Sequence, residues 1–515
     1  MTPEEFVNHF QNKYINKSIK TTFLSSIIFG LFAHGYMLTN KLPNYDDVSG
    51  LAHTYGTGIA SGRWMLSALG NFVKIVMENF SLPWFNGILS ICIIGLAACI
   101  ITQIFDIEDK VLCALTGAIM VSFPPLTCTL FFMYTCVYYC ISILICAFAV
   151  LCIKRNHKYG AALGMLLLSA SLGIYQAHIS FAIALLLLVL IQDCMNDADW
   201  KQIIMQSFKY LILLAGAFII YFLLVRLSLL VKGAELIGYQ GIDKMGHVNI
   251  IEIPSQIALA YKQYFKLFYS DIFSINPYPL IKAAILLLHI TMLIITVYGI
   301  YSKKAVDILE IVLLFMIFPL AVNLIYVMAP KSYVYSIMMY SMVAVFLAVI
   351  LLLQLSHKIL FNKNLARLIQ WTGTVCLLLI ILLQCQYNNV QYLAMNMQYE
   401  QAHSYMTTLV TRIKSTEGYN SSMNLVFIGE RFEDPTFYTN DEFEEYNMAG
   451  RGQELVNIYC QEDFLRRFIG YTQPQDTNWK PWSQLDEVKI MPAYPDDGSI
   501  KVINNTIVIK RQHVD

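Results

Sequence analysis

Residues 84–105 of the chain read WFNGILSICIIGLAACIITQIF, a run of 22 residues without a charged side chain. About 20 apolar residues in an α-helix cross the roughly 30 Å hydrocarbon core of a lipid bilayer. The rest of the chain has the same character, because 57% of its 515 residues are hydrophobic and 14% are charged, against about 25% charged in soluble proteins. The sequence therefore predicts an all-α polytopic membrane protein, with the lipid bilayer among its partners.

The same measure of hydropathy, applied along the whole chain, predicts about eleven transmembrane helices. We expect them near residues 20–40, 84–105, 110–127, 128–153, 159–175, 177–193, 207–231, 280–301, 306–328, 333–355 and 367–385. The division within 159–193 depends on Tyr175 and Gln176, which interrupt an otherwise continuous apolar run.

Lysine and arginine in short loops indicate the orientation, because such loops stay on the cytoplasmic side. Basic clusters precede the first predicted helix and follow the fourth, eighth and tenth: Lys13, Lys17 and Lys20; Lys154, Arg155 and Lys158; Lys303 and Lys304; Lys358, Lys363 and Arg367. With an odd number of membrane helices, all four basic clusters lie on the cytoplasmic side of the membrane. We therefore expect a cytoplasmic N-terminus and outer loops at 41–83 and 232–279. Each loop contains an amphipathic stretch, at 64–74 and 257–273, of the kind that lies in the membrane interface.

The C-terminal region differs in charge from the rest of the chain. Of the 35 acidic residues, 18 lie after position 399, whereas 24 of the 35 basic residues lie before it. We expect a membrane domain at 1–390 and a small extracytoplasmic α/β domain at 391–515. Within it the pattern predicts a helix at 396–417, a strand at 425–428 and a hairpin at 500–509 with Asn-Asn at its turn.

Charge and cysteine usage exclude several classes of protein. Basic and acidic residues are equal in number, so no excess of charge is present to bind nucleic acid. Eleven of the twelve cysteines lie in or beside predicted helices, and no CxxC pair has partner histidines. We therefore expect apolar filler cysteines and no zinc site.

Asp46 and Asp47 are the main candidates for chemistry. They follow the first predicted helix in the segment LPNYDD, residues 42–47. Adjacent carboxylates near a membrane surface repel one another, which raises the pKa of one of them. A raised carboxyl pKa suits a general acid or base near neutral pH. Two alternatives fit the same spacing: a solvated polar loop, and a divalent-cation site built on carboxylate oxygens.

Three cationic residues are expected on the same side as the Asp pair. Arg63 opens the interfacial stretch in SGRW, residues 61–64, where a guanidinium and free backbone N–H groups favour a phosphate or carboxylate. Arg226 lies late in the seventh predicted helix, and Lys331 lies between the ninth and tenth. Charged residues within membrane helices indicate function, whereas anchoring in the interface is the simpler alternative for Arg63 and Trp64.

Aromatic and polar residues complete the predicted outer cluster. Tyr175, Gln176 and His178 mark the outer turn between the fifth and sixth predicted helices. Together with the Asp pair, Gly62-Arg63-Trp64 and Gly173-Ile174-Tyr175-Gln176 give the chain a recognisable pattern. It resembles the Gtr-type (GtrII) serotype-converting glucosyltransferases, polytopic enzymes of GT-C-like architecture, over roughly residues 10–390. The acidic tail lies outside the resemblance.

The resemblance implies a sugar transfer at the outer face of a bacterial cell membrane. The donor would be a polyprenyl-phosphate-linked sugar such as glucose, and the acceptor a cell-surface polysaccharide such as O-antigen. Asp46 or Asp47 would be the catalytic carboxylate. Arg63, Arg226 and Lys331 would stabilise the departing lipid phosphate, and Trp64, Tyr175, Gln176 and His178 would contact the substrates.

Other functions remain open on the sequence. A lipid-linked oligosaccharide flippase or transporter would show matched broken helices in two halves, and the sequence contains no such repeat. An envelope glycan polymerase is also polytopic with basic outer loops, and it would transfer whole oligosaccharides. A structural scaffold does not account for an Asp pair beside cationic residues.

Overall fold

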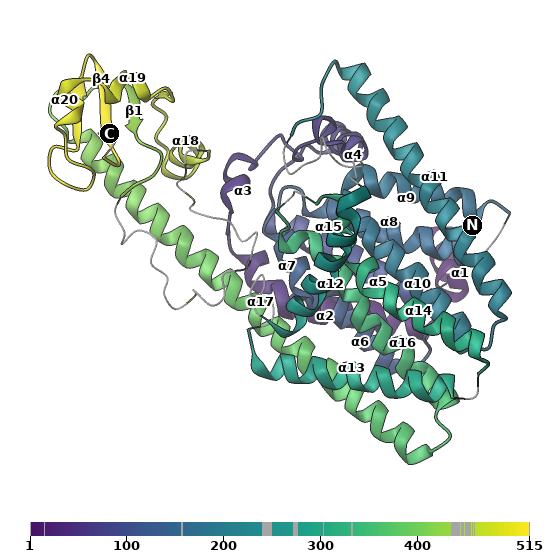
Figure 1. The fold of residues 1–515 in the computed structure, drawn as a ribbon. Coiled ribbons are helices and arrows are strands. Elements are labelled where there is room, and N and C mark those ends of the chain that lie inside the picture. The colour runs from purple at the N-terminus through teal and green to yellow at the C-terminus, as the bar shows by residue number, and fades with distance from the viewer. Residues whose placement is uncertain are drawn as a thin grey trace.

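The computed structural model describes residues 2–513, except 15, 156–157, 239–249, 271–276, 302, 331–332, 434–442, 444–447, 449–454, 456 and 458. Within these residues, nine helices are long and apolar enough to cross a membrane, and the bent pair of α6 (Lys110–Ser122) and α7 (Pro124–Leu130) makes a tenth crossing. The prediction of a polytopic helical membrane protein is confirmed, as is a small sheet near the C-terminus (Figure 1).

A helix stands at each of the eleven predicted positions. These helices are α2 (Lys17–Thr39), α5 (Pro83–Ile104), α6 with α7, α8 (Cys136–Arg155), α9 (Gly160–Ile174), α10 (Ile179–Met195), α11 (Trp200–Lys232), α13 (Pro279–Ile300), α14 (Ala305–Val322), α16 (Ala344–Ile359) and α17 (Lys363–Lys414). The difference in number arises at α9, whose 15 residues extend about 22 Å at 1.5 Å per residue. That length is shorter than the hydrocarbon core.

Shorter elements connect the membrane helices. They are α1 (Pro3–Tyr14), α3 (Tyr45–Ser49), η1 (Ile59–Ser61), α4 (Trp64–Val76), η2 (Gln176–His178), η4 (Ile250–Glu252), α12 (Ile253–Tyr269), α15 (Ile325–Met328) and η6 (Ser336–Val343). The helices α4 and α12 occupy the two amphipathic stretches of the predicted outer loops. Residues 271–273 of the second stretch lie outside the described residues.

The sequence predicted one continuous helix at 128–153, and this prediction is wrong. The helix α7 ends at Leu130 and α8 begins at Cys136, and turns occupy residues 131–135. Hydropathy does not register this break, because Phe131, Phe132 and Met133 are as apolar as the helices beside them. The break leaves backbone N–H groups outside a helix, where side chains from other segments can bind them.

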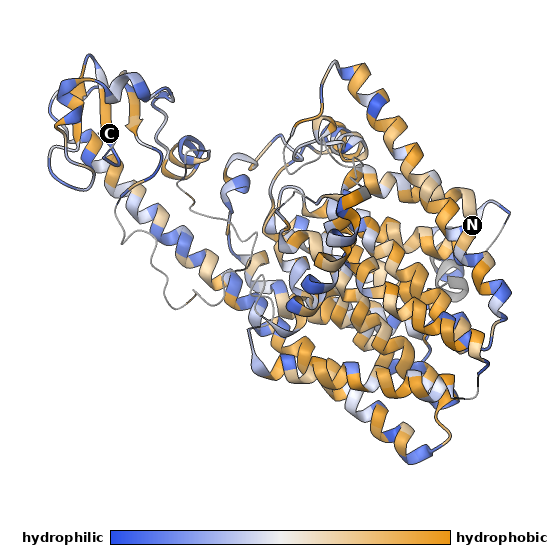
Figure 2. Ribbon diagram, viewed as in Figure 1, coloured by the Kyte–Doolittle hydropathy of each residue, from blue (hydrophilic) through white to orange (hydrophobic). Residues whose placement is uncertain are grey.

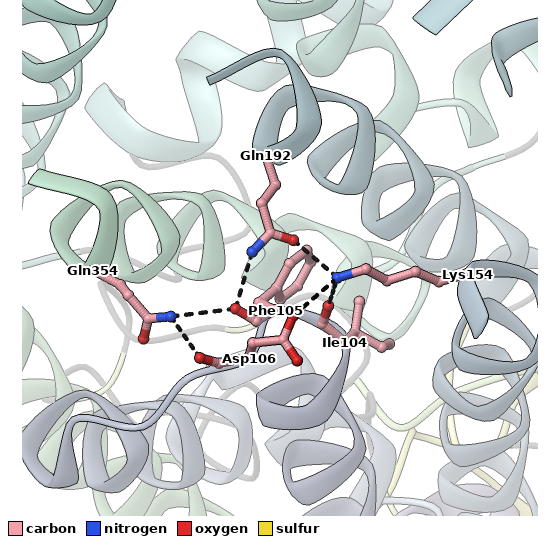
Figure 3. A network of polar contacts seen from close by, with 6 residues as sticks. All are labelled: Ile104, Phe105, Asp106, Lys154, Gln192 and Gln354. Carbon is pink, nitrogen blue, oxygen red and sulfur yellow. Dashed lines mark hydrogen bonds and ion pairs between the residues drawn. The ribbon is translucent and has the colours of Figure 1, made fainter. Parts of the chain in front are cut away.

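Polar contacts tie the helix ends together at one end of the bundle (Figure 3). Lys154, at the end of α8, donates to Gln192 Oε1 of α10 at 3.0 Å and lies 3.5 Å from the Asp106 carboxylate. Gln192 and Gln354, from α10 and α16, both donate to the carbonyl oxygen of Phe105. These contacts balance the charge of a lysine at a membrane-flanking position.

The same end contains a second lysine and a cavity. Lys303, beyond α13, donates to the carbonyl oxygen of Cys194 at 2.7 Å and pairs with Asp197 at 2.6 Å. Two of the predicted basic clusters are thus near one end of α10. A cavity of about 710 Å³ opens beside the network, with Asp106, Lys358 and Trp371 among its lining residues. It contains none of the site residues predicted from the sequence.

The helix α17 links this bundle to the C-terminal region without a break. Its 52 residues pass straight through the domain boundary expected near residue 390, and Figure 2 shows the change from a hydrophobic bundle to a more hydrophilic outer half. We call the described residues after Lys414 the C-terminal unit. Its hydrophobic cluster includes side chains from the outer part of α17, such as Met406 and Leu409.

The C-terminal unit contains a four-stranded sheet in the order β2-β1-β4-β3. Its strands are β1 (Asn424–Ile428), β2 (Gln475–Asp476), β3 (Ile500–Ile503) and β4 (Thr506–Lys510), and its helices are α18 (Gln461–Phe464), the π-helical turn η9 (Leu465–Ile469), α19 (Lys480–Ser483) and α20 (Asp486–Lys489). Strand β1 is parallel to β2 and β4, whereas β3 and β4 form the predicted hairpin. Asn504 and Asn505 turn it with φ of 49° and 58°, a left-handed conformation that asparagine tolerates.

Candidate active site

The Asp pair lies on α3, a helix of five residues between the bundle and the C-terminal unit (Figure 1). Asn44 precedes it as the N-cap residue: the Asn44 side chain accepts a hydrogen bond from the Asp47 N–H at 2.9 Å. Gly50 ends it, with its N–H directed to the carbonyl oxygen of Asp46. Successive residues of a helix are about 100° apart, so Asp46 and Asp47 face different surroundings.

Asp47 faces the bundle and is 2% exposed. Its Oδ2 accepts a hydrogen bond from the N–H of Met133, and its Oδ1 accepts from the N–H of Tyr134, both at 3.1 Å. The Ser81 hydroxyl donates to Oδ1 at 3.1 Å. Burial raises the pKa of Asp47 to about 7, although these three donors lower it. Asp47 therefore fixes α3 to the break between α7 and α8.

Asp46 lies at the junction of the bundle and the C-terminal unit. It is partly exposed, and burial raises the pKa of its carboxyl group. It lies within electrostatic range of Tyr134 from the bundle and of Cys460 from the C-terminal unit. Among the described residues, no hydrogen bond or ion pair engages the Asp46 carboxylate. Among the described residues, Asp46 is therefore the member of the pair whose carboxylate oxygens are not already occupied by donors.

Arg63 forms the cationic part of the site. Its Nη1 donates to the Tyr139 hydroxyl at 3.0 Å, and its guanidinium lies 5.0 Å from the centre of the Tyr175 ring. The Tyr139 and Tyr175 rings stack with centroids 4.4 Å apart. The Arg63 Nε is buried without a hydrogen-bond partner, and within the described part of the chain no carboxylate pairs with this guanidinium. A partly buried cation without a counter-ion favours binding of an anion.

The two glycine-containing motifs meet in space. A Cβ on Gly173 would lie 2.6 Å from the indole Nε1 of Trp64, so the absence of a side chain there lets α4 pack against the end of α9. Gln176 donates to the carbonyl oxygen of Ser61 at 2.8 Å and to the Tyr221 hydroxyl at 3.1 Å. Trp64, Tyr175 and Gln176 therefore lie beside Arg63 in the structure.

His178 lies behind this cluster. It is 1% exposed, with its ring edge-on to Tyr175 at 4.9 Å between centroids. Both ring nitrogens are buried, and neither has a hydrogen-bond partner among the residues that the structure describes. Its position supports the Tyr175 ring and keeps it against Arg63.

Of the two other predicted phosphate-binding residues, Arg226 does not join the cluster. Arg226 is exposed on α11, off the buried face that carries Tyr221 and Val225, and no described contact connects it to Arg63. An apolar run predicts a helix but does not indicate which way one of its residues points. Lys331 lies outside the described residues.

The alternative of a divalent-cation site has little support from the described geometry around the pair. Both Asp47 oxygens already accept hydrogen bonds from N–H or O–H donors. No group of three or more His, Cys, Asp or Glu residues that could hold a metal ion occurs in the described ranges. The donors around Asp47 suit an anion, because N–H and O–H groups direct positive charge toward it.

Sequence reasoning missed the residues that organise the site. Ser81, Met133 and Tyr134 hold Asp47, and Tyr139 holds Arg63. Tyr134 lies within electrostatic range of both Asp residues and of Arg63. The one sequence signal was the density of tyrosines at 134–139, within a run that hydropathy assigns to a helix.

Comparison with known protein families gives a match to the first part of the chain. The family model described as Glucosyl transferase GtrII matches residues 35–352. The matched region includes α3, the Arg63 cluster and the break before α8, and it ends before α17 and the C-terminal unit. A search of curated proteins and a search of solved structures gave no match.

Proposed function

Because the chain belongs to the GtrII glucosyl transferase family, we propose that it transfers glucose from a polyprenyl-phosphate-linked donor to a cell-surface glycan, with Asp46 as the general base. Family membership supports the glucosyltransferase role. The donor, the acceptor and the base are parts of the proposal. We place the reaction at the outer face of a bacterial cell membrane, with a cytoplasmic N-terminus and an extracytoplasmic domain at 391–515.

The proposed reaction is a single displacement. Asp46 accepts the proton of the acceptor hydroxyl, whose oxygen attacks the anomeric carbon of glucose. The bond between that carbon and the lipid phosphate breaks, and the phosphate leaves with the electron pair. Asp46 meets the need for a base within hydrogen-bond reach, and Arg63 meets the need for a fixed positive charge where negative charge develops. One displacement inverts the anomeric configuration.

One observation carries the proposal: the segment 134–139 contacts both the helix of the unengaged Asp46 carboxylate and the Arg63 guanidinium. The N–H of Tyr134 binds α3 through Asp47 at 3.1 Å, and the Tyr139 hydroxyl accepts a hydrogen bond from Arg63 at 3.0 Å. Asp47 is a weaker candidate for the base, because it is 2% exposed and accepts three hydrogen bonds. We assign it the role of holding α3 in place. A carboxylate that the acceptor hydroxyl cannot contact cannot remove the proton of that hydroxyl.

The test uses the full chain in lipid nanodiscs, with polyprenyl-phosphate [¹⁴C]glucose and membrane glycan as acceptor, with and without EDTA. We expect Asp46→Asn to lower transfer about 10²- to 10⁴-fold, with an unchanged thermal midpoint. Glu417→Gln is the matched control, because Glu417 is an exposed carboxylate after α17. Transfer at the wild-type rate by Asp46→Asn contradicts the assignment of the base.

The donor and the unit transferred are tested in the same assay. A panel of lipid-linked sugars identifies the donor if glucose is not moved. Transfer of a whole oligosaccharide would replace the proposal with the polymerase function. Movement of the lipid-linked sugar across the bilayer without transfer would replace it with a flippase. Loss of activity in EDTA would reinstate the cation at the Asp pair.

A further inference from the structure

The helix α3 cannot maintain its own conformation. It has five residues, and a helix this short is unstable in isolation because its first turn costs more conformational entropy than one hydrogen bond returns. Its direction, and therefore the direction of Asp46, depends on what its other side chains and its ends contact. On the bundle side that contact is Asp47, described above. The opposite side of α3 meets the C-terminal unit.

Val48 attaches α3 to the C-terminal unit. It is 0% exposed, and it belongs to the hydrophobic cluster of that unit together with Phe464 and Leu465, not to the cluster of the bundle. Lys41, before α3, lies 4.5 Å from the centre of the Phe468 ring. Residues on both sides of Asp46 are thus held by the segment 464–468.

Arg467 completes the attachment at the C-terminus of α3. Its Nη1 donates to the carbonyl oxygens of Val48 at 3.3 Å and Ser49 at 3.2 Å. These are carbonyls of the last turn, which lack partners within the helix and which a cation stabilises. The Arg467 Nε is itself fixed by Asp463 at 3.2 Å. The contact joins residues more than 400 positions apart in the chain.

We propose that Arg467 is a positioning residue for glycosyl transfer: by binding the last carbonyls of α3, it makes the C-terminal unit fix the direction of Asp46. This inference depends on the proposed function, since it assumes that Asp46 is the base. The Arg63 cluster is built from α4, α8, α9, η2 and α11, none of which contributes to these contacts. The C-terminal unit therefore controls the base and leaves the binding of the donor phosphate unchanged.

The test compares Arg467→Ala with Arg466→Ala in full-length protein, using the nanodisc transfer assay. Arg466 is the matched control, because it is the adjacent arginine and pairs with the same Asp463, and among the described residues no hydrogen bond joins it to α3. We expect Arg467→Ala to lower kcat about 10- to 100-fold, since a displacement of about 1 Å has effects of that size. The donor KM should stay at the wild-type value. Arg467→Lys, which keeps a donor to the carbonyls, should restore part of kcat.

Two further measurements distinguish positioning from a general loss of folding. Release of α3 exposes Asp46 to water and lowers its raised pKa, so the acid limb of the pH profile of kcat should move to lower pH in Arg467→Ala. In the Asp46→Asn background, Arg467→Ala should cause no further loss. A kcat and a pH profile equal to those of Arg466→Ala, with Asp46→Asn inactive, would overturn this inference and leave the proposed function intact. An active Asp46→Asn would overturn the proposed function instead.

Discussion

Replacing Asp47 by asparagine should change how the stability of the protein depends on pH. Burial raises the pKa of Asp47 from 3.8 to about 7. Between these values the folded protein holds a proton that the unfolded chain has released. Wild-type stability therefore falls as the pH rises through this window. Asparagine does not titrate, so the Asp47→Asn variant lacks this part of the slope.

The magnitude follows from two opposing contributions. A shift of about three pKa units corresponds to about 4 kcal/mol at 1.36 kcal/mol per unit, which the wild type loses between pH 4 and pH 8. Asparagine replaces one acceptor oxygen by an NH₂ group, so the N–H of Met133 or Tyr134 loses its acceptor, at about 1–3 kcal/mol independent of pH. The variant should therefore be less stable than the wild type at pH 5 and should equal or exceed it at pH 8.

The assay is denaturant unfolding in detergent micelles from pH 4.5 to 8.5, followed by intrinsic fluorescence. The informative quantity is the difference in free energy of unfolding between Asp47→Asn and the wild type. Glu417→Gln, which alters an exposed carboxylate, should follow the wild type throughout. A difference that is constant across this range would refute the reasoning, because it would mean that the three donors outweigh burial and keep Asp47 ionised.

Substitutions at Arg63, Gly173 and Lys154 test the rest of the site and the fold. Arg63→Met should lower kcat/KM for the donor about 10²-fold or more, as loss of a fixed positive charge does. In donor titrations, Arg63→Lys should give a kcat/KM between those of the wild type and Arg63→Met, because an ammonium group lacks the guanidinium fork. Gly173→Ala places a Cβ 2.6 Å from the Trp64 indole and should reduce transfer and shift tryptophan fluorescence, whereas Gly35→Ala, with nothing within 4 Å, should do neither. Lys154→Met removes the donor at the opposite end of the bundle and should lower stability by about 1–3 kcal/mol in thermal unfolding with activity per folded molecule unchanged.

The membrane helices were predictable because hydropathy is a local property of the chain. Each predicted position holds a helix, and the hairpin turns at Asn504 and Asn505 as the sequence indicated. The break at 131–135 was not predictable in this way. It begins with the apolar residues Phe131, Phe132 and Met133, and it is stabilised by Asp47, which lies 86 positions from Met133 in the chain.

The types of residue in the site were predictable, but their contacts were not. Gly62-Arg63-Trp64 and Gly173 to Gln176 stood out as separate motifs, and the structure pairs Trp64 with Gly173 and Arg63 with Tyr175. Arg226 also has the right charge, yet it is exposed on α11. The orientation of a side chain around a helix depends on the neighbouring helices, and hydropathy does not contain that information.

The sequence by itself determined that this chain forms apolar helices long enough to cross a membrane, that a pair of carboxylates and then an arginine follow the first of them, and that a small α/β unit follows the last. Only the tertiary structure decided how the two carboxylates differ. Asp46 and Asp47 are chemically identical neighbours, so their difference comes from desolvation and from donors on distant segments. Ser81, Met133 and Tyr134 engage Asp47. No described donor engages the Asp46 carboxylate, which is partly exposed. The properties of a carboxylate depend on what packs around it, and only the tertiary structure decides that.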